Sequence, residues 1–194
     1  RGKYMQQAVP VGQGAMAAII GLDDKAILSA CTEASTLGVV DAVNFNAPGQ
    51  VVIAGANDAV ERAMDICKAA GAKRALPLPV SAPFHTSLMK PAADNLAEMV
   101  NTITFRAPEV PVMHNVHAKN EHDPQAIKAL MLEQIYSPVK WVDCVEQLKD
   151  SGVSALVECG PGKVLSGLAK RIDRELIAIS TESVTDFDAA LTTI

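Results

Sequence analysis

The sequence has 194 residues, with 17 Lys plus Arg against 22 Asp plus Glu and a formal net charge of −5. With 49% hydrophobic and 20% charged residues, its composition is that of a globular protein and excludes a disordered chain. The acidic balance and the scarcity of aromatic residues (one Trp, two Tyr, four Phe) argue against a nucleic-acid-binding protein.

Residues 13–80 contain two successive strand–helix–strand patterns. Apolar runs predict the strands, and Asp23 and Asn57 each stand where a residue caps a following helix. The order β-α-β-β-α-β is typical of a ferredoxin-like split sheet, which we predict for this segment. The predicted strands are residues 14–21, 39–46, 50–56 and 74–80.

From Pro83 onward, helices alternate with short strands. A buried-type strand at residues 155–159 precedes a turn at 160–162 and a helix, an order that belongs to a parallel α/β sheet with helices on its faces. We therefore predict two architectures in one chain, with the first inserted into the second. The other predicted helices are residues 88–102, 124–135 and 142–149, and the other extended pieces are Phe105, residues 110–116 and residues 176–180.

The four cysteines lie far apart without a C-x-x-C pair, which predicts reduced, buried thiols in a cytoplasmic protein. The uncharged stretch between Tyr4 and Leu22 is interrupted by Pro10, three glycines and three glutamines, so we predict no membrane-spanning helix and no membrane partner. The sequence begins at Arg1 without an initiator methionine, and we expect it to belong to a longer chain.

Three histidines raise the question of a metal site. His114 and His117 form H-x-x-H, and His122 follows them. If residues 114–117 are extended, the first two side chains point to opposite faces and do not converge on one ion. No carboxylate or thiol stands at a matching spacing, so we predict no metal and interpret these residues as loop histidines.

His85 lies in an uncharged stretch rich in proline, immediately before a predicted helix. Proline fixes the backbone, which suits a general base whose geometry must be constant. A packed histidine at a helix entrance is an equally good interpretation. A serine nucleophile on a G-x-S-x-G turn is absent from the sequence. The turn Gly160-Pro-Gly162-Lys163 departs from a P-loop because Val164 follows the lysine, and we interpret it as a strand-to-helix turn with its amides facing a cleft.

Long blocks of the sequence carry a family resemblance. They are R-G-x-x-M-Q at 1–6, G-A-M-A-A-I-I-G-L at 14–22, N-F-N-A-P-G-Q-V-V-I-A-G at 44–55, A-K-R-A-L-P-L-P-V-S-x-P-x-H at 72–85, M-K-P-A-A at 89–93 and E-C-G-P-G-K-V-L at 158–165. In these blocks, which extend over nearly the whole chain, the sequence resembles the malonyl-CoA:acyl carrier protein transacylases.

The resemblance implies an α/β fold with an α/β-hydrolase-like parallel-sheet body, incomplete in this sequence, and an inserted ferredoxin-like β-α-β-β-α-β subdomain. Residues 13–80 would form the small subdomain, and residues 1–12 and 81–194 would belong to the acyltransferase body. Both parts agree with the two architectures predicted above from the residues.

The resemblance also implies an acyltransferase of fatty-acid synthesis. It would transfer malonyl from coenzyme A to the phosphopantetheine thiol of acyl carrier protein, by ping-pong chemistry through an acyl-serine. His85 matches the histidine that activates the serine, and Arg1 matches the arginine that binds the malonyl carboxylate through two parallel hydrogen bonds. Malonyl-CoA is then a substrate, and no cofactor is expected.

Five further positions take an expected role from the resemblance. Met5 matches a residue that lines the acyl pocket, and Asn46 and Gln50 match a cleft-facing loop of the insert. Gln134 matches the position whose backbone carbonyl orients the histidine ring. Phe84 departs from the family pattern, and we expect its ring to crowd the malonyl α-carbon and disfavour branched acyl groups.

The family's nucleophile serine and first oxyanion donor belong to a segment upstream of Arg1, so we expect residues 1–194 alone to be inactive and to need that segment as a partner. A catalytically empty module that binds a ligand or a carrier protein is the alternative. Carrier proteins are acidic, and two basic trios are candidate docking residues, although a solvated surface is the simpler explanation for them. The trios are Lys68, Lys73 and Arg74, and Lys170, Arg171 and Arg174.

Overall fold

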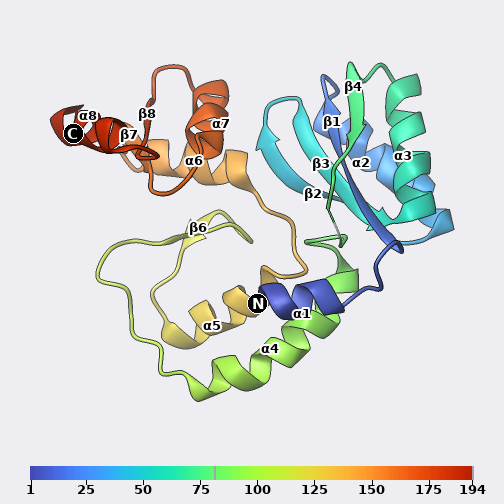
Figure 1. The fold of residues 1–194 in the computed structure, drawn as a ribbon, viewed down its shortest axis with the longest axis horizontal. Helices are drawn as coiled ribbons and strands as arrows, with labels where there is room; N and C mark the ends of the chain where they lie inside the picture. Colours follow the sequence, from blue (N-terminus) through green and yellow to red (C-terminus); the bar gives the residue numbers. More distant parts are fainter. Residues whose placement is uncertain (81, 194) are drawn as a thin grey trace. The chain divides into compact units, whose positions relative to one another are not determined.

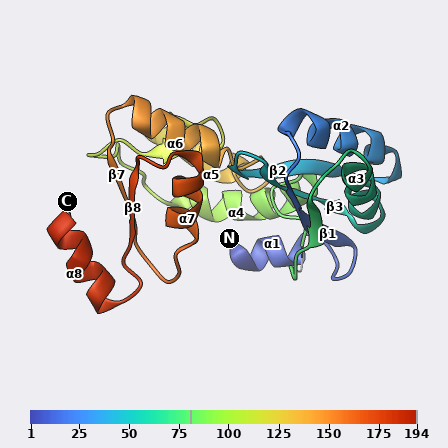
Figure 2. The same cartoon turned by 90° about the horizontal axis from the view of Figure 1, so that it is seen from above.

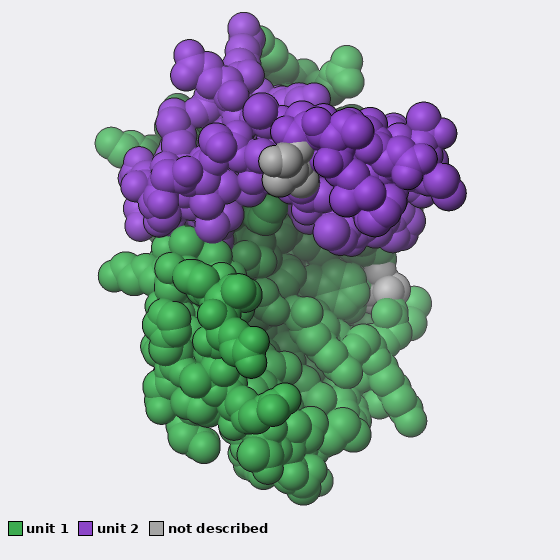
Figure 3. Space-filling model, turned by 90° about the vertical axis from the view of Figure 1, so that its left-hand side faces the viewer, with its two compact units in different colours: residues 1–141 green, residues 142–194 purple. Residues whose placement is uncertain are grey.

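A computed structural model describes residues 1–80 and 82–193. The chain forms two compact units, residues 1–141 and 142–194, which Figure 3 distinguishes by colour. The segment 13–80 lies inside the first unit together with residues 1–12 and 82–141. The sequence predicts a different division, with residues 13–80 as one subdomain and the remainder as the other, and that division stays a prediction. Residues 81 and 194, which belong to the predicted remainder, lie outside the described residues.

A four-stranded antiparallel sheet forms the centre of the first unit, with strand order β2-β3-β1-β4. Two helices, α2 (Asp24–Ala34) and α3 (Asn57–Ala69), cover one of its faces (Figure 1). The chain order is therefore β1-α2-β2-β3-α3-β4, as the apolar pattern predicts. The strands are β1 (Gly14–Ile20), β2 (Val40–Ala47), β3 (Gln50–Ala56) and β4 (Arg74–Pro77).

Local sequence explains how these elements begin and pair. The Asp23 carboxylate accepts a hydrogen bond from the Ala26 amide at 3.0 Å and so caps α2 as predicted. A Cβ at Gly55 would lie 1.9 Å from the Val39 carbonyl oxygen, so only glycine lets the chain pass there. The core between sheet and helices includes the fully buried side chains of Ile19, Ile27, Val51, Ile53 and Cys67.

The rest of the first unit consists of helices around a second apolar cluster. This cluster includes Met5, Met89, Leu96, Val100 and Ile135. Figure 2 shows α1 and α4 lying side by side. The elements are α1 (Gly2–Gln7), the 3-10 helix η2 (Ser87–Met89), α4 (Lys90–Thr102), α5 (Pro124–Glu133) and the short hairpin β5 (Met113–His114) and β6 (Lys119–Asn120).

Backbone hydrogen bonds join this helical part to the sheet. The Phe45 amide donates to the Val139 carbonyl at 3.0 Å, and the Val139 amide donates to the Val43 carbonyl at 2.8 Å, at the β2 edge. On the sheet face opposite α2 and α3, Leu78 and Phe84 pack against a small cluster of Met16, Val43, Val52 and Ala54. The segment that leads to His85 therefore lies against the sheet.

The second unit contains a parallel pair of strands, β7 (Ala155–Glu158) and β8 (Ile177–Ser180). Helix α7 (Val164–Ile172) connects them, which is the predicted strand-turn-helix-strand order. Helix α6 (Trp141–Asp150) precedes this pair, and α8 (Val184–Thr193) follows it. A parallel pair requires such a crossover because its two strands begin at the same end.

The structure corrects several sequence interpretations. Asn57 does not cap α3, because it is the first residue of that helix and its side chain donates to the Gly12 carbonyl. Cys159 is exposed, whereas the other three cysteines are buried as expected, because Cys159 follows the end of β7 in the turn toward α7. Residues 110–116 are extended only at 113–114, where the chain enters the β5–β6 hairpin. Over the described ranges, every helix falls short of the length and apolar character needed to cross a lipid bilayer.

Candidate active site

His85 stands in a tight turn between the sheet and η2. Its φ angle is +66°, in the left-handed region that costs a residue with a Cβ about 1–2 kcal/mol. The preceding Pro83 is fully buried, and the following Thr86 is 1% exposed. Packing on both sides therefore holds the imidazole on a strained backbone, which is where functional residues often occur.

The imidazole of His85 has a defined hydrogen-bond partner. Its Nδ1 lies 2.9 Å from the backbone carbonyl oxygen of Gln134, which caps the C-terminal end of α5. A carbonyl only accepts, so Nδ1 must carry the proton and Nε2 presents a lone pair. This contact is the one that the resemblance implies for Gln134, and it is made by the main chain.

Burial lowers the pKa of His85 below its ordinary value of 6.5, and the positive charge of Arg1 lowers it further. Hydrogen bonds to the backbone of Gln134 and Ser137 act in the opposite direction without reversing the shift. His85 is therefore neutral at pH 7. A neutral imidazole that carries its proton on Nδ1 and has an unprotonated Nε2 is the form that accepts a proton in general-base catalysis.

The depressed pKa of His85 makes the stability of the fold depend on pH. The unfolded chain takes up a proton near 6.5, whereas the folded protein keeps His85 neutral to lower pH. The contribution of His85 to the free energy of unfolding is thus fully present above pH 6.5 and is lost as the pH falls through the folded-state pKa. We expect His85→Gln to reduce the difference in urea midpoint between about pH 7.5 and about pH 5.5.

The exposed His122 offers a matched control for a histidine-to-glutamine substitution, and the urea midpoints of His122→Gln are measured at the same two pH values. A His85→Gln protein whose midpoint falls with pH as steeply as the parent's would contradict the assignment of this effect to His85.

Arg1 lies close enough to His85 for its charge to act on the imidazole. Arg1 is an exposed residue that precedes α1, yet neighbouring atoms partly desolvate its guanidinium and lower its pKa. An arginine stays protonated at neutral pH even so. These residues, 84 positions apart in the sequence, come near each other because α1 contacts α4, the helix that begins just after the His85 turn.

The other predicted site residues have varied surroundings. Met5 is 7% exposed and belongs to the apolar cluster under the His85 turn, so its side chain is core. Phe84 is half-buried and packs against both this cluster and the one on the sheet. Asn46 and Gln50 are in strands β2 and β3 rather than in a loop, because the turn between the strands is only Pro48-Gly49. The expectation of a loop at these two residues is wrong.

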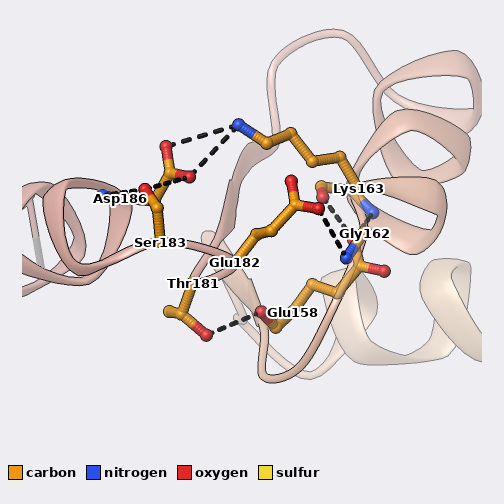
Figure 4. Close-up of polar contacts among 8 residues, drawn as sticks. Glu158, Gly162, Lys163, Thr181, Glu182, Ser183 and Asp186 are labelled. Carbon is orange, nitrogen blue, oxygen red and sulfur yellow. Dashed lines mark hydrogen bonds and ion pairs between the residues drawn. The ribbon is translucent and has the colours of Figure 1, made fainter.

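The turn Gly160–Lys163 in the second unit connects β7 to α7, as predicted (Figure 4). Its surroundings are acidic: the Gly162 amide donates to the Glu182 carboxylate at 3.2 Å, and Lys163 pairs with Asp186. The Glu158 carboxylate accepts hydrogen bonds from the amides of Leu165 at 3.0 Å and Ser166 at 2.8 Å. The Gly162 amide and the first amides of α7 are therefore occupied within the unit, and the expectation that the turn amides face a cleft stays a prediction.

Removal of the Glu158 carboxylate is expected to destabilise the second unit. Burial opposes ionisation of Glu158, but hydrogen bonds from the Ser166 hydroxyl and from helix amides outweigh it and hold its pKa below the usual range. Capping bonds of this kind contribute about 1 kcal/mol, so Glu158→Ala should lower the free energy of unfolding by about that amount. The matched control is Glu182→Ala, which removes a single bond from Gly162.

Urea unfolding of both variants at neutral pH measures this difference. The contribution of Glu158 is present above its ordinary pKa of 4.5 and is lost as the pH falls through the folded-state value. Equal unfolding free energies for Glu158→Ala and the parent would contradict the capping role.

The histidines at 114 and 117 do not point apart as predicted. Their ring centroids are 6.0 Å apart in an edge-to-face arrangement, because the chain turns between β5 and β6 instead of continuing as a strand. Among residues 1–80 and 82–193, no group of three His, Cys, Asp or Glu side chains is placed to hold a metal ion.

Comparison with known proteins gives one consistent family. Residues 1–184 match the model of the acyl transferase domain. Malonyl CoA-acyl carrier protein transacylase of Escherichia coli K12 is 58% identical over 98% of the chain, and the protein of that name from Bacillus subtilis is 43% identical over 100% of it.

Solved structures give the same family. A crystal structure of an acyl carrier protein S-malonyltransferase from Vibrio cholerae is 57% identical and superposes with a TM-score of 0.96 over 98% of the chain and 62% of that structure. A malonyl-transacylase in complex with a type II PKS acyl carrier protein is 52% identical, with a TM-score of 0.97 over 100% of the chain and 62% of that structure.

The chain spans 62% of the length of both curated relatives. The match covers the His85 turn, Arg1 and Gln134, and the α/β fold agrees with the solved structures. The sequence resemblance to malonyl-CoA:acyl carrier protein transacylases is confirmed, and the chain belongs to the acyl transferase domain family.

Proposed function

We propose that this chain provides the general base and the carboxylate-binding arginine of a malonyl-CoA:acyl carrier protein transacylase of fatty-acid synthesis. The observation that carries the proposal is the neutral His85, held by the Gln134 carbonyl and close to the Arg1 guanidinium. The names of the relatives support the choice of acyl group and acceptor.

The proposed chemistry begins with a serine hydroxyl supplied from outside this sequence, which contains no G-x-S-x-G motif. Nε2 of His85 takes the serine proton while the serine oxygen attacks the thioester of malonyl-CoA, and the coenzyme A thiolate leaves with that proton. The phosphopantetheine thiol of acyl carrier protein then attacks the malonyl-serine, while His85 takes the proton of the thiol and returns it to the leaving serine oxygen. Arg1 pairs with the malonyl carboxylate throughout.

The finer description of the fold belongs to the same proposal. The connectivity β1-α2-β2-β3-α3-β4, with both helices on one face, supports a ferredoxin-like subdomain at residues 13–80. The parallel β7–β8 pair with its crossover helix supports an α/β-hydrolase-like body to which residues 1–12 and 81–194 contribute.

Labelling with radioactive malonyl-CoA tests the proposed function. A protein that joins residues 1–194 to a segment bearing G-H-S-x-G should become labelled on serine and should release the label to holo acyl carrier protein. Residues 1–194 alone should stay unlabelled. Binding of coenzyme A or of carrier protein without any label in the joined protein would instead support the alternative, a catalytically empty binding module.

Phe84 is proposed to restrict the acyl group. Its half-buried ring joins two apolar clusters and is the residue immediately before His85, so it fills space beside the base. We expect Phe84→Ser to raise the rate with methylmalonyl-CoA relative to malonyl-CoA by about tenfold, since one methyl group is worth about that factor in a tight pocket. Phe105→Ser, at another half-buried ring of the same cluster, should leave the ratio unchanged. An unchanged ratio of the methylmalonyl-CoA rate to the malonyl-CoA rate in Phe84→Ser would contradict the proposal that Phe84 restricts the acyl group.

The remaining site assignments are also proposals. Met5 would support the acyl pocket from the core, and Asn46 and Gln50 would face the substrate from the end of the β2–β3 hairpin. Carrier-protein docking on the basic trios is supported only by their positive charge. In the first trio, Lys68 already forms an ion pair with Asp65 at 3.1 Å. A cytoplasmic location stays an expectation of the same proposal.

A further inference from the structure

The turn that carries His85 is held through one residue, Pro83. Pro83 is fully buried, and its ring lies directly on β1 at Gly14. A Cβ built on Gly14 would stand 2.3 Å from Cδ and 2.7 Å from Cγ of Pro83. Both distances are shorter than real Cβ contacts, and a proline ring is too rigid to move aside. The absence of a side chain at Gly14 therefore sets how deeply Pro83 lies against the sheet.

The same proline is held from the other side by Thr86. The Thr86 hydroxyl donates to the Pro83 carbonyl oxygen at 2.8 Å, and both residues are shielded from water. This bond closes the four-residue turn Pro83–Thr86, in which His85 occupies the third position with its positive φ. A positive φ at that position is typical of a type II turn, which normally has glycine there.

We propose that Gly14 and Thr86 are positioning residues of the active site, which act through Pro83 to hold His85 in its left-handed conformation and its ring against the Gln134 carbonyl. This inference rests on the proposed function only for the role of His85 as a base. The chain after Thr86 enters η2 through the bond from the Met89 amide to the Thr86 carbonyl at 3.0 Å. Thr86 thus fixes both the turn before it and the helix after it.

The two side-chain features make separate contributions. Without the Thr86 hydroxyl, the Pro83 carbonyl loses a buried hydrogen bond, and the turn is free to relax toward a backbone with negative φ at His85. With a methyl group at position 14, the Pro83 ring must leave β1 and carry the turn with it. Either change moves the His85 ring away from the Gln134 carbonyl, which is 49 residues away in the sequence and belongs to a different element.

The test is an NMR titration of the imidazoles in ¹⁵N-labelled protein, with the His85 signals assigned from their absence in His85→Gln. The parent should show a single neutral form with the proton on Nδ1 and a pKa below 6.5. Thr86→Val keeps the shape and removes the hydroxyl. We expect it to give a mixture of the two neutral forms and to shift the pKa further below 6.5, because the hydrogen bond to the Gln134 carbonyl, which raises the pKa, is lost. Thr86→Ser retains the hydroxyl and should behave as the parent does.

Gly14→Ala should change the His85 signals in the same direction as Thr86→Val. Its matched control is Gly167→Ala in α7, where a Cβ would meet no atom within 4 Å, and it should leave these signals unchanged. If Gly14→Ala does not fold, the comparison of Thr86→Val with Thr86→Ser still tests whether the Thr86 hydroxyl positions the His85 ring.

Wild-type His85 signals in both Thr86→Val and Gly14→Ala, with lower melting temperatures alone, would overturn the proposal and leave two ordinary core residues. A shift in only one variant would overturn the claim for the other residue, and a shift in Thr86→Ser as large as in Thr86→Val would overturn the role of the hydroxyl. Because the titration needs no substrate, its outcome is independent of malonyl transfer, and a failure of the proposed function is recognised separately by the labelling experiment.

Discussion

Replacement of His85 with alanine is expected to slow malonyl transfer by about 10²–10⁴-fold in the protein that joins this chain to its nucleophile segment. The base contributes that factor because a serine hydroxyl is a weak nucleophile until its proton is removed. His85 meets the requirements: its pKa is lowered by burial, its Nδ1 faces the Gln134 carbonyl at 2.9 Å, and its Nε2 is left to accept a proton.

The measurement is a single-turnover assay of malonyl-serine formation, which separates the chemical step from product release. His122→Ala, at an exposed histidine, is the matched control and should transfer malonyl at the parent's rate. A His85→Ala protein that acylates its serine within a few-fold of the parent would show that another group serves as the base.

Replacement of Arg1 with glutamine is expected to lower kcat/KM for malonyl-CoA by about 10- to 100-fold, because a charged hydrogen-bonded pair contributes about 1.5–3 kcal/mol. The effect should be selective, since acetyl-CoA lacks the carboxylate that Arg1 is proposed to bind. Arg1→Lys keeps the charge but not the planar pair of donors, and it should recover only part of the loss.

The nearby exposed Lys3 provides a control for general electrostatic attraction of the acidic substrate. Lys3→Gln removes a positive charge but leaves the planar pair of donors of Arg1 in place. Equal losses for malonyl-CoA and acetyl-CoA in Arg1→Gln would mean that Arg1 supports the fold or the His85 pKa rather than the carboxylate. The role of Arg1 is therefore decided by the ratio of kcat/KM for malonyl-CoA to kcat/KM for acetyl-CoA, and not by the absolute rate with either substrate.

The four-stranded sheet was predictable because its strands are apolar runs bounded by turn residues. Asp23 caps its helix at the predicted place, since a carboxylate before an apolar helix satisfies free amides. The prediction failed at the end of β4, which stops at Pro77 instead of residue 80. Prolines at 77 and 79 lack the amide hydrogens that a strand needs to continue its ladder.

The site was less predictable because its contacts join distant segments. Nothing in the local sequence pairs His85 with Gln134 or brings it close to Arg1, and both assignments came from the family resemblance. The positive φ of His85 was also hidden, since turn statistics favour glycine at such a position. His114 and His117 were misjudged because a two-residue strand followed by a turn has no clear periodic signal.

The pairing of Val139 with β2 has a consequence for solubility. Outer strands of a sheet expose backbone donors and acceptors that recruit strands of other molecules, and β2 is an outer strand here. The hydrogen bonds of Val139 to Phe45 and Val43 occupy part of that border with the protein's own main chain. The segment that presents the Gln134 carbonyl to the imidazole thereby also helps to keep one molecule from aggregating with the next.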